Sequence, residues 1–310
     1  MKILVTGGAG FIASHVTDAF IAAGHDVVVL DSLITGRPEL VNPAAKFVKM
    51  DIRDKALAEL FAAEKFDVIN HHAAQMDVRK SVADPAFDAD VNVLGTLNLL
   101  ENAVKYGVKK FMFASTGGAI YGEQDYFPAD ENHPQRPLSP YGITKLTTEK
   151  YLHFYKHVHG LNYFITRYAN VYGPRQNPHG EAGVVAIFCS KLLADGQPVI
   201  NGDGKQTRDY VFIKDVVRAN VAGLNYLESD VVNVGTGIET DVNQLYQALR
   251  DELAPVIPEQ HGPAMPGEQM RSVINHAKAK KLLGWEPTVD VTDGLKITAR
   301  WFRDTGGRGR

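Results

Sequence analysis

The sequence predicts an α/β protein, with a doubly wound parallel sheet in one domain and a smaller C-terminal domain that interleaves with it. Three observations predict this class. Short apolar runs rich in β-branched residues recur through the first half of the chain, helix-length segments separate them, and a glycine-rich turn joins the first run to the first helical segment. Continuous apolar strands that alternate with helices indicate a parallel sheet covered on both faces.

The predicted elements can be placed along the chain. Strands are expected at 3–5, 27–30, 47–50, 68–70, 110–114 and 163–166, with helices at 12–23, 55–64, 91–106 and 141–160. After about residue 172 two Gly-, Pro- and charge-rich stretches, GPRQNPHGEAG and NGDGKQTRD, enclose short elements, and VVNVG at 231–235 is expected to return to the sheet. We therefore predict one domain at 1–172 plus about 215–238, and a second at 173–214 and 239–310.

The composition excludes several classes of partner. The chain has 310 residues, is 45% hydrophobic and carries a net charge of −3, which indicates no nucleic acid and no anionic membrane as partner. No apolar run approaches the roughly 18 residues that span a bilayer. The single cysteine, Cys189, excludes an internal disulfide and fits a reducing compartment. Because the first strand is expected to start at Lys2, there is no room for a signal peptide, and a cytoplasmic location is the expectation.

The glycine-rich turn predicts a dinucleotide site. Gly7, Gly10 and Ala13 form G-x-x-G-x-x-A between the first strand and the first helix, and Asp31 ends the second strand. Glycine lets the backbone approach a ligand closely, and a helix N-terminus offers free N–H groups to a pyrophosphate. A carboxylate at the position of Asp31 can accept hydrogen bonds from ribose hydroxyls and repels a 2′-phosphate. This domain is therefore expected to be a Rossmann domain that binds NAD rather than NADP.

The stretch TGGAGFIA at 6–13 resembles the extended, nucleotide-sugar-modifying branch of the short-chain dehydrogenase/reductase superfamily, with Ala13 where a third glycine is usual. The superfamily signature is Tyr-x-x-x-Lys. Three pairs have this spacing: Tyr106 with Lys110, Tyr141 with Lys145, and Tyr210 with Lys214.

Local context separates the three pairs. Tyr106 is expected to end a helix, and Tyr210 lies in the extended-looking stretch RDYVFIKD. Tyr141 opens a helix, so Lys145 lies on the same helix face. A phenol has a pKa of about 10, and a neighbouring ammonium favours the phenolate. Tyr141 is therefore expected to be the general base, with Lys145 lowering its pKa and binding the nicotinamide ribose.

The third catalytic group implied by the resemblance is a hydroxyl at the end of the fifth strand. The stretch FMFASTGGAIYG offers Ser115 and Thr116. Counting from the strand favours Thr116. Counting back from Tyr121 gives a position that is off by one residue, because this loop carries an extra glycine relative to most relatives. Both hydroxyls therefore remain candidates.

Further blocks resemble the same family, and in particular the UDP-glucose 4-epimerases that carry STGGAIYG. They are HHAAQMDVRKSVADP (71–85), NVLGTLNLLE (92–101), RYANVYGPRQNPHGEAGVV (167–185), NGDGKQTRDYVFIKDV (201–216) and KKLLGWEP (280–287). The resemblance implies NAD-dependent inversion at C4 of a UDP-sugar, between UDP-glucose and UDP-galactose, through a 4-keto intermediate. It also implies a homodimer that pairs through the helices starting near Asn92 and Tyr141, and it implies no metal.

The resemblance also implies site residues. For the cofactor they are Gly7, Gly10, Phe11, Ile12, Asp31, Ser32, Leu33, Thr35, Gly36, Asp51, Ile52, His72, Ala73, Ala74, Asn92, Tyr141, Lys145, Tyr168 and Val171. For the nucleotide sugar they are Thr116, Tyr141, Asn170, Val184, Val185, Arg208, Arg271 and Ser272.

Several of these residues have simpler alternatives. Asn92 could be a helix N-cap, Arg208 could form a surface ion pair with Asp209, and Ser272 could be a loop serine that points elsewhere. Ser272 is placed against the C2 substituent of the sugar by counting from the Pro-Gly-Glu block at 266–268. Relatives often carry arginine where this chain has Met265, so Arg271 is expected to carry more of the phosphate contact.

The loop after Thr116 indicates which reaction of this fold the chain catalyses. Dehydratases of this fold carry an Asp-Glu pair there, and decarboxylating relatives a glutamate, whereas this chain has Gly117, Gly118 and Ala119. Epimerisation is therefore favoured. The alternatives are an epimerase of UDP-glucuronate or of a UDP-N-acetylhexosamine, and a non-catalytic NAD-sensing protein of the same fold.

Overall fold

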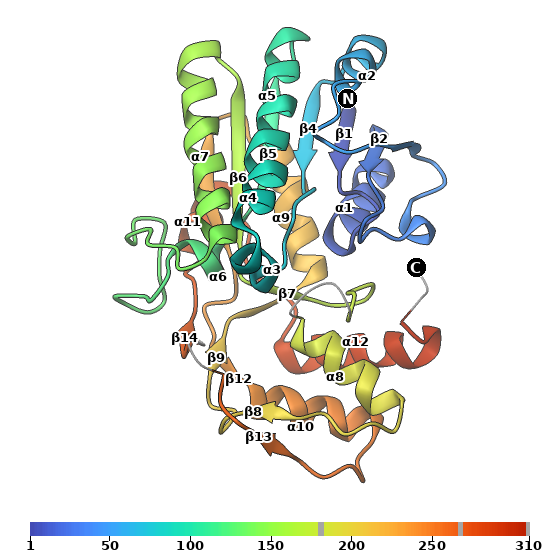
Figure 1. Ribbon diagram of the computed structural model, residues 1–310, viewed down its shortest axis with the longest axis vertical. Helices are drawn as coiled ribbons and strands as arrows, with labels where there is room; N and C mark the ends of the chain where they lie inside the picture. The colour runs from blue at the N-terminus through green and yellow to red at the C-terminus, as the bar shows by residue number, and fades with distance from the viewer. Residues whose placement is uncertain (179–182, 266–268, 308–310) are drawn as a thin grey trace.

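The computed structural model describes residues 1–178, 183–265 and 269–307, and its centre is a parallel sheet of seven strands (Figure 1). The strand order is β11-β6-β5-β4-β1-β2-β3, and every neighbouring pair is parallel. The order reverses between β1 and β4, as in a doubly wound sheet. The strands are β1 (Lys2–Thr6), β2 (Asp26–Asp31), β3 (Lys46–Lys49), β4 (Val68–His71), β5 (Lys110–Thr116), β6 (Asn162–Tyr168) and β11 (Asp230–Val234).

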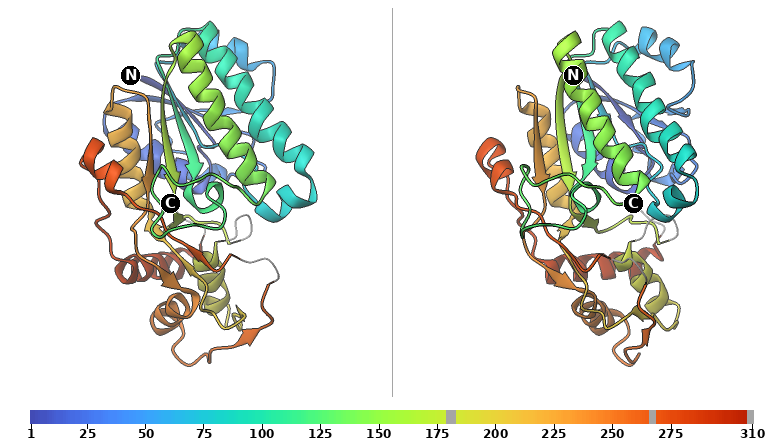
Figure 2. Two further views of the ribbon diagram at one scale, coloured as in Figure 1. Left: turned by 90° about the vertical axis from the view of Figure 1, so that its left-hand side faces the viewer. Right: turned by 60° about the vertical axis from the view of Figure 1, so that its left-hand side comes forward.

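Helices cover both faces of the sheet, which confirms the predicted fold class (Figure 2). On one face α1 (Phe11–Ala22) packs against α9 (Ile213–Asn225), and on the other lie α2 (Leu57–Glu64), α5 (Gly95–Lys105) and α7 (Pro140–His159). Side chains alternate between the two faces, as a strand requires. Ile3 and Val5 belong to the hydrophobic cluster on the α1 face, whereas Leu4 belongs to the one on the α7 face.

The structure differs from the sequence prediction around 78–94. Two short helices, α3 (Val78–Ala83) and α4 (Pro85–Ala89), follow β4, and the predicted helix at 91–106 consists of a π-helical turn, η2 (Asp90–Leu94), followed by α5. Hydrophobic periodicity cannot distinguish one π turn from an α turn, because the apolar side chains still lie on one face. These segments lie near the end of the sheet where its strands terminate (Figure 1).

The C-terminal elements form a second layer beyond that end of the sheet. Helices α8 (Val184–Leu193), α10 (Val242–Leu253) and α12 (Val291–Thr305) pack together. Strand β7 (Asn170–Tyr172) pairs with β10 (Tyr210–Phe212). The remaining elements are η1 (Pro38–Leu40), α6 (Gly117–Ile120), α11 (Ala277–Leu283), β8 (Ile200–Asn201), β9 (Thr207–Arg208), β12 (Thr240–Asp241), β13 (His261–Gly262) and β14 (Arg271–Ser272).

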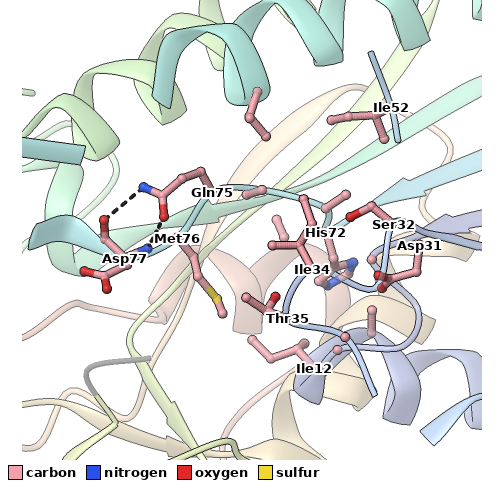
Figure 3. Close-up of a pocket in the computed structure, with 18 of the residues that line it drawn as sticks. Ile12, Asp31, Ser32, Ile34, Thr35, Ile52, His72, Gln75, Met76 and Asp77 are labelled. Atoms are coloured by element: carbon pink, nitrogen blue, oxygen red, sulfur yellow. Dashed lines mark hydrogen bonds between the residues drawn. The ribbon is translucent and has the colours of Figure 1, made fainter. Parts of the chain in front are cut away.

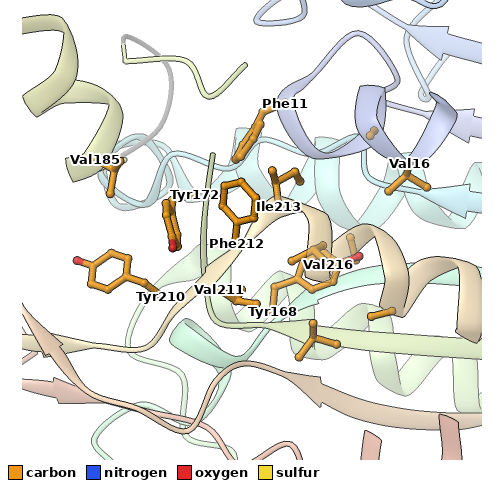
Figure 4. Packing of buried hydrophobic residues seen from close by; sticks show 14 of the residues in the cluster. Phe11, Val16, Tyr168, Tyr172, Val185, Tyr210, Val211, Phe212, Ile213 and Val216 are labelled. Carbon is orange, nitrogen blue, oxygen red and sulfur yellow. The ribbon is translucent and has the colours of Figure 1, made fainter. Parts of the chain in front are cut away.

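One hydrophobic cluster is continuous between the sheet and these C-terminal elements. It contains Phe11 and Val16 of α1 together with Tyr172, Val185 and Phe212 (Figure 4). Because aromatic side chains bury large areas, this cluster fixes the C-terminal elements close to the edge where the predicted site residues lie.

Candidate active site

A pocket opens at the carboxyl ends of the sheet strands, where ligands of doubly wound proteins bind. Most residues expected around the cofactor line it, from the glycine turn, the end of β2, the loop after β4, and α7. They are Gly7, Gly10, Phe11, Ile12, Asp31, Ser32, Thr35, Gly36, Asp51, Ile52, His72, Ala73, Ala74, Tyr141, Lys145 and Tyr168. Figure 3 labels Ile12, Asp31 and His72 among them. Ser115, one of the two candidate catalytic hydroxyls, also lines the pocket.

The glycine turn lets two loops approach closely. Gly7 has φ +71°, and a Cβ there would lie 2.8 Å from the backbone nitrogen of Ala73. Gly10 is the N-cap of α1 and provides no side-chain cap, so the first-turn N–H groups are left for another partner. Phe11 and Ile12 of this first turn line the pocket. The turn therefore has the features of an anion-binding site.

Asp31 lies on the far side of the same turn. Its carboxylate is buried and accepts hydrogen bonds from the backbone nitrogens of Ala9 (3.0 Å) and Leu33 (2.8 Å). Burial raises the pKa of Asp31, while these two hydrogen bonds lower it. A Cβ at Gly36 would lie 2.6 Å from the Asp31 carboxylate. Leu33 positions Asp31 through its backbone and does not line the pocket.

Tyr141 and Lys145 lie one turn apart near the start of α7. The helix begins after Ser139, whose hydroxyl accepts a hydrogen bond from the Gly142 nitrogen (3.1 Å). The Lys145 ammonium lies 5.7 Å from the centre of the Tyr141 ring and donates to the Ala114 carbonyl (2.8 Å). The pKa of Lys145 is lowered to about 8, because the effect of burial exceeds the opposing effect of the Asp88 and Glu149 carboxylates.

The other two Tyr-x-x-x-Lys pairs are split between elements. Tyr106 is the C-cap of α5, and Lys110 in β5 donates to the Gly223 carbonyl (2.5 Å) on the opposite face of the sheet. Tyr210 lies in β10, whereas Lys214 is an exposed residue of α9. Only the pair on α7, among the three, contributes both residues to the pocket.

The two candidate hydroxyls have different partners. Ser115 is buried and its Oγ donates to Glu149 Oε1 (2.6 Å). Thr116 is half-buried and caps the short α6, where its Oγ1 accepts from the Ala119 nitrogen (3.2 Å). A hydroxyl that accepts one bond can still donate its proton, so Thr116 retains a donor.

Asn92 lies within the π-helical turn and is not an N-cap. Its Oδ1 accepts from the Gln75 nitrogen (2.8 Å) and its Nδ2 donates to the Gln75 carbonyl (2.9 Å). Gln75 lines the pocket, whereas Asn92 does not. The sequence reasoning did not identify Gln75, because its role depends on partners from α4 and η2 that are distant in sequence. The other lining residues that it did not include are Ala13, Leu30, Ile34, Met50, Met76, Asp77, Lys80, Phe87, Val91 and Ala114.

Tyr168 and Val171 lie on either side of a strand junction. Tyr168 ends β6 and lines the pocket, with its ring stacked on His72 at 6.1 Å. Its hydroxyl accepts from Asn220 Nδ2 (2.8 Å), and burial raises its pKa to about 12. Val171 packs against the hydrophobic cluster instead.

Apart from Tyr141, the residues expected to bind the nucleotide sugar, Thr116 included, are not among those that line the pocket. Val185 is buried in the hydrophobic cluster, whereas its neighbour Val184 and Asn170 are half-buried. Val185 lies on the inner face of α8, and the sequence could not define that face because the start of α8 was not predicted.

The two arginines expected to meet the phosphates differ in their pairing. Arg208 in β9 donates to the Thr207 carbonyl (2.8 Å), whereas both oxygens of the Asp209 carboxylate accept from Thr236. The Arg271 guanidinium pairs with Glu239 (2.5 Å) and lies 3.8 Å from the Phe127 ring centre.

Ser272 is buried in β14 and is the register partner of Arg208 in β9. The block at 266–268 from which Ser272 was counted lies outside the described residues. Within residues 1–178, 183–265 and 269–307, no group of three or more His, Cys, Asp or Glu side chains could hold a metal ion. In the same ranges, no helix combines the length and the apolar character needed to cross a bilayer.

Comparisons with known proteins identify the family of the chain. The model of the NAD dependent epimerase/dehydratase family matches residues 3–235. A UDP-glucose 4-epimerase of Mycolicibacterium smegmatis is 46% identical, over 98% of this chain and 99% of its own length. A Thermotoga maritima UDP-glucose 4-epimerase solved with UDP-glucose is 48% identical, with a TM-score of 0.96 over 98% of this chain and 99% of that one. A Thermus thermophilus UDP-glucose 4-epimerase solved with NAD is 42% identical, with a TM-score of 0.94 over 98% and 100%. The chain belongs to the NAD dependent epimerase/dehydratase family.

Proposed function

We propose that this protein is an isomerase that inverts the configuration at C4 of a UDP-sugar, interconverting UDP-glucose and UDP-galactose through a 4-keto intermediate, with NAD as its resident cofactor. One observation carries the proposal: Tyr141 and Lys145 line the same pocket as the glycine turn and Asp31. A general base and a dinucleotide site are thereby combined in one cavity, in a chain whose relatives are named UDP-glucose 4-epimerases.

The residues present fit NAD. The first turn of α1 has no side-chain cap, which leaves N–H groups for a pyrophosphate. The imidazole Nδ1 of His72, a pocket residue, is buried and has no hydrogen-bond partner among the described residues. Asp31 would accept from the adenosine ribose hydroxyls, and Lys145 would donate to the nicotinamide ribose. When bound, NAD accepts hydride from C4 of the sugar and returns it to the opposite face.

Tyr141 would move the proton that accompanies this exchange. Its phenolate takes the proton of the C4 hydroxyl during oxidation and returns it to the same oxygen during reduction. The Lys145 ammonium favours the phenolate electrostatically, because an adjacent positive charge stabilises the anion. Lys145 is fixed for this role by its hydrogen bond to Ala114 and by burial.

Thr116 is the hydroxyl that we propose to contact the reacting oxygen. The Ser115 proton is donated to the Glu149 carboxylate, so Ser115 would have to break a charge-assisted hydrogen bond to act. Among the described residues, Thr116 Oγ1 only accepts a bond, from the Ala119 nitrogen. Asn170 Oδ1 lies near the same loop, 3.9 Å from an ideal Gly118 Cβ. We place Thr116 and Asn170 around the sugar and its first phosphate.

For the diphosphate, the pairing of the guanidinium groups favours Arg208 over Arg271. Among the described residues, the Arg208 guanidinium makes one hydrogen bond, to a carbonyl, whereas that of Arg271 makes two to a carboxylate. A guanidinium with unused donors can form the paired hydrogen bonds that phosphates favour. We propose Arg208 as the main phosphate contact, with Arg271 beside it, Val184 near the base, and Ser272 near the sugar.

The test is direct. The purified protein is incubated with UDP-galactose, and UDP-glucose is measured. We expect conversion in both directions to one equilibrium ratio. A protein that only senses NAD would form no UDP-glucose. A lack of UDP-glucose would therefore overturn the proposal. An epimerase of UDP-glucuronate or of a UDP-N-acetylhexosamine would convert those sugars faster than UDP-galactose.

We also propose a homodimer. Ile143, Phe154 and Val158 on α7 expose 51%, 48% and 53% of their surface, and Leu94 in η2 exposes 58%. The three residues on α7 share one face at helical spacing, and an apolar face of this kind is typical of a protein interface. Sedimentation of the wild type and of Phe154→Glu tests this, with a dimer expected for the first and a monomer for the second.

A cytoplasmic location is likewise a proposal. Its support is Cys189, which is buried in the hydrophobic cluster and forms no disulfide. Burial raises the pKa of this thiol to about 12, so it is neutral and unreactive at physiological pH. Fractionation of the native host would test the location, and recovery of the protein outside the cytoplasm would contradict it.

A further inference from the structure

Asp88 is a buried carboxylate that the proposed mechanism does not use. It lies in α4, is 0% exposed, and takes part in no ion pair among the described residues. Three neutral donors satisfy it: Thr144 Oγ1 (2.8 Å), Gln75 Nε2 (2.9 Å) and Asn92 Nδ2 (3.2 Å). Burying an ionised carboxylate without a paired cation is costly. The charge of Asp88 is therefore expected to act on a neighbouring group.

The three donors come from three different segments. Gln75 belongs to the loop after β4 that lines the pocket, Asn92 to η2, and Thr144 to α7, directly before Lys145. Asn92 also bonds both backbone groups of Gln75. The Gln75 side chain in turn bonds both backbone groups of Asp77 (Figure 3). Asp88 therefore connects the cofactor-facing loop to the helix that carries the catalytic pair.

The charge of Asp88 acts on Lys145. The Lys145 ammonium donates to a neutral carbonyl, and two carboxylates favour its charged form: Asp88 from α4 and Glu149 from α7 itself. Glu149 is already paired with the buried Arg167 of β6.

Among the described residues near Lys145 other than Tyr141, no further titratable group adds an unpaired negative charge. On β4 and directly after it, burial lowers the pKa of both His71 and His72, and Lys145 lowers it further, so both are neutral at pH 7. On α3, Lys80 lies over the Phe87 ring, and in η2, Asp90 pairs with Arg53. Of the two carboxylates that act on Lys145, Asp88 is thus the one whose charge no guanidinium of the described residues offsets.

We propose that Asp88 is a positioning residue of the active site: its carboxylate fastens the loop at Gln75 to α7 and supplies the negative charge that balances the Lys145 ammonium. The inference rests on the proposed function, because that function assigns Lys145 its role. It predicts that loss of the Asp88 charge changes both the hydrogen exchange of the loop at Gln75 and the pKa of Lys145. Loss of one hydrogen-bond donor to Asp88 should change the exchange of the loop alone.

The main variant is Asp88→Asn, which keeps the shape, removes the charge, and places an amide donor among existing donors. Without the neighbouring negative charge, the charged form of Lys145 is less stable, so its pKa falls. We expect a fall of about one unit, measured in the apo-protein by 13Cε NMR titration with Lys145→Arg for assignment. The alkaline limb of kcat should move to lower pH by a similar amount. Hydrogen exchange of residues 72–78 should also become faster in the apo-protein.

Asp84→Asn is the matched control. Asp84 is the exposed N-cap of the same helix, and asparagine is an equally good cap. This control removes the same charge four positions away, where solvent screens it, and should change neither the Lys145 titration nor the exchange.

A second variant covers the case in which Asp88→Asn does not fold. Thr144→Val keeps the Asp88 carboxylate and removes one of its hydrogen-bond donors. Hydrogen exchange of residues 72–78 should therefore become faster, while the pKa of Lys145 should not fall. Unchanged exchange in Thr144→Val, or an unchanged Lys145 titration in a folded Asp88→Asn protein, would overturn the inference. A wild-type protein that does not convert UDP-galactose would refute the proposed function instead, and the NMR and exchange results would still decide the role of Asp88.

Discussion

The guanidinium of Arg167 and the carboxylate of Glu149 form a two-pronged ion pair directly behind the pocket wall. Nε donates to Oε1 (3.0 Å) and Nη2 to Oε2 (2.6 Å), and the two side chains are 2% and 5% exposed. Glu149 also accepts from Ser115, and Arg167 also donates to the Tyr121 hydroxyl (2.9 Å). The pair therefore ties α7 and β6 to the β5 end and loop that carry Thr116.

Glu149→Gln should destabilise the protein strongly. Removing one partner of a buried ion pair leaves the other charge without compensation and typically costs about 3–5 kcal/mol. Urea unfolding measures the free energy of unfolding of the variant. The control is Asp125→Asn, because Asp125 pairs with Arg136 at the surface, where such pairs contribute at most about 1 kcal/mol. A loss in Glu149→Gln no larger than in the control would show that Arg167 is satisfied by other groups.

Tyr141→Phe should retain bound NAD but lose turnover. The phenyl ring still packs, while no group remains to accept the C4 hydroxyl proton, and loss of a general base typically lowers kcat by about 10²–10⁴-fold. Turnover is measured with UDP-galactose, and bound cofactor after denaturation of the purified protein. Tyr106→Phe and Tyr210→Phe should leave the chemical step unchanged. Activity near that of the wild type in Tyr141→Phe would remove this residue from the mechanism.

Sequence reasoning predicted those residues of the candidate site whose geometry is local. Gly10 precedes its helix, Asp31 ends its strand, and Tyr141 and Lys145 are one helical turn apart, so spacing along the chain was sufficient. Asp88 is different, because its partners Gln75 and Thr144 are 13 and 56 residues away. No periodicity relates these three residues, and only the packing of α4 between the β4 loop and α7 brings them together.

Asp31 should make the protein prefer NAD to NADP. Its carboxylate faces the pocket while Ala9 and Leu33 hold it in place, and a 2′-phosphate there would meet a like charge. The apo-protein is titrated with each cofactor in competition, and NAD should bind at least about tenfold more tightly. Asp31→Asn removes the charge and should reduce this ratio. Tighter binding of NADP by the wild type would contradict the assignment.

Ser272 should govern whether the site accepts an N-acetylated sugar. It is 4% exposed and pairs in register with Arg208, the proposed phosphate contact, and we expect a larger side chain there to extend toward the sugar. With serine, the wild type should convert both UDP-galactose and UDP-N-acetylgalactosamine. Ser272→Tyr should lower kcat/KM for the N-acetylated sugar selectively, by about tenfold or more, because a steric clash excludes the acetamido group.

Ser272→Ala is the matched control and should leave the ratio of the two kcat/KM values unchanged. Thermal unfolding of each variant separates exclusion from misfolding, since a disrupted β14 would lower both kcat/KM values together, and an unchanged ratio in a folded Ser272→Tyr protein would place Ser272 outside the sugar site.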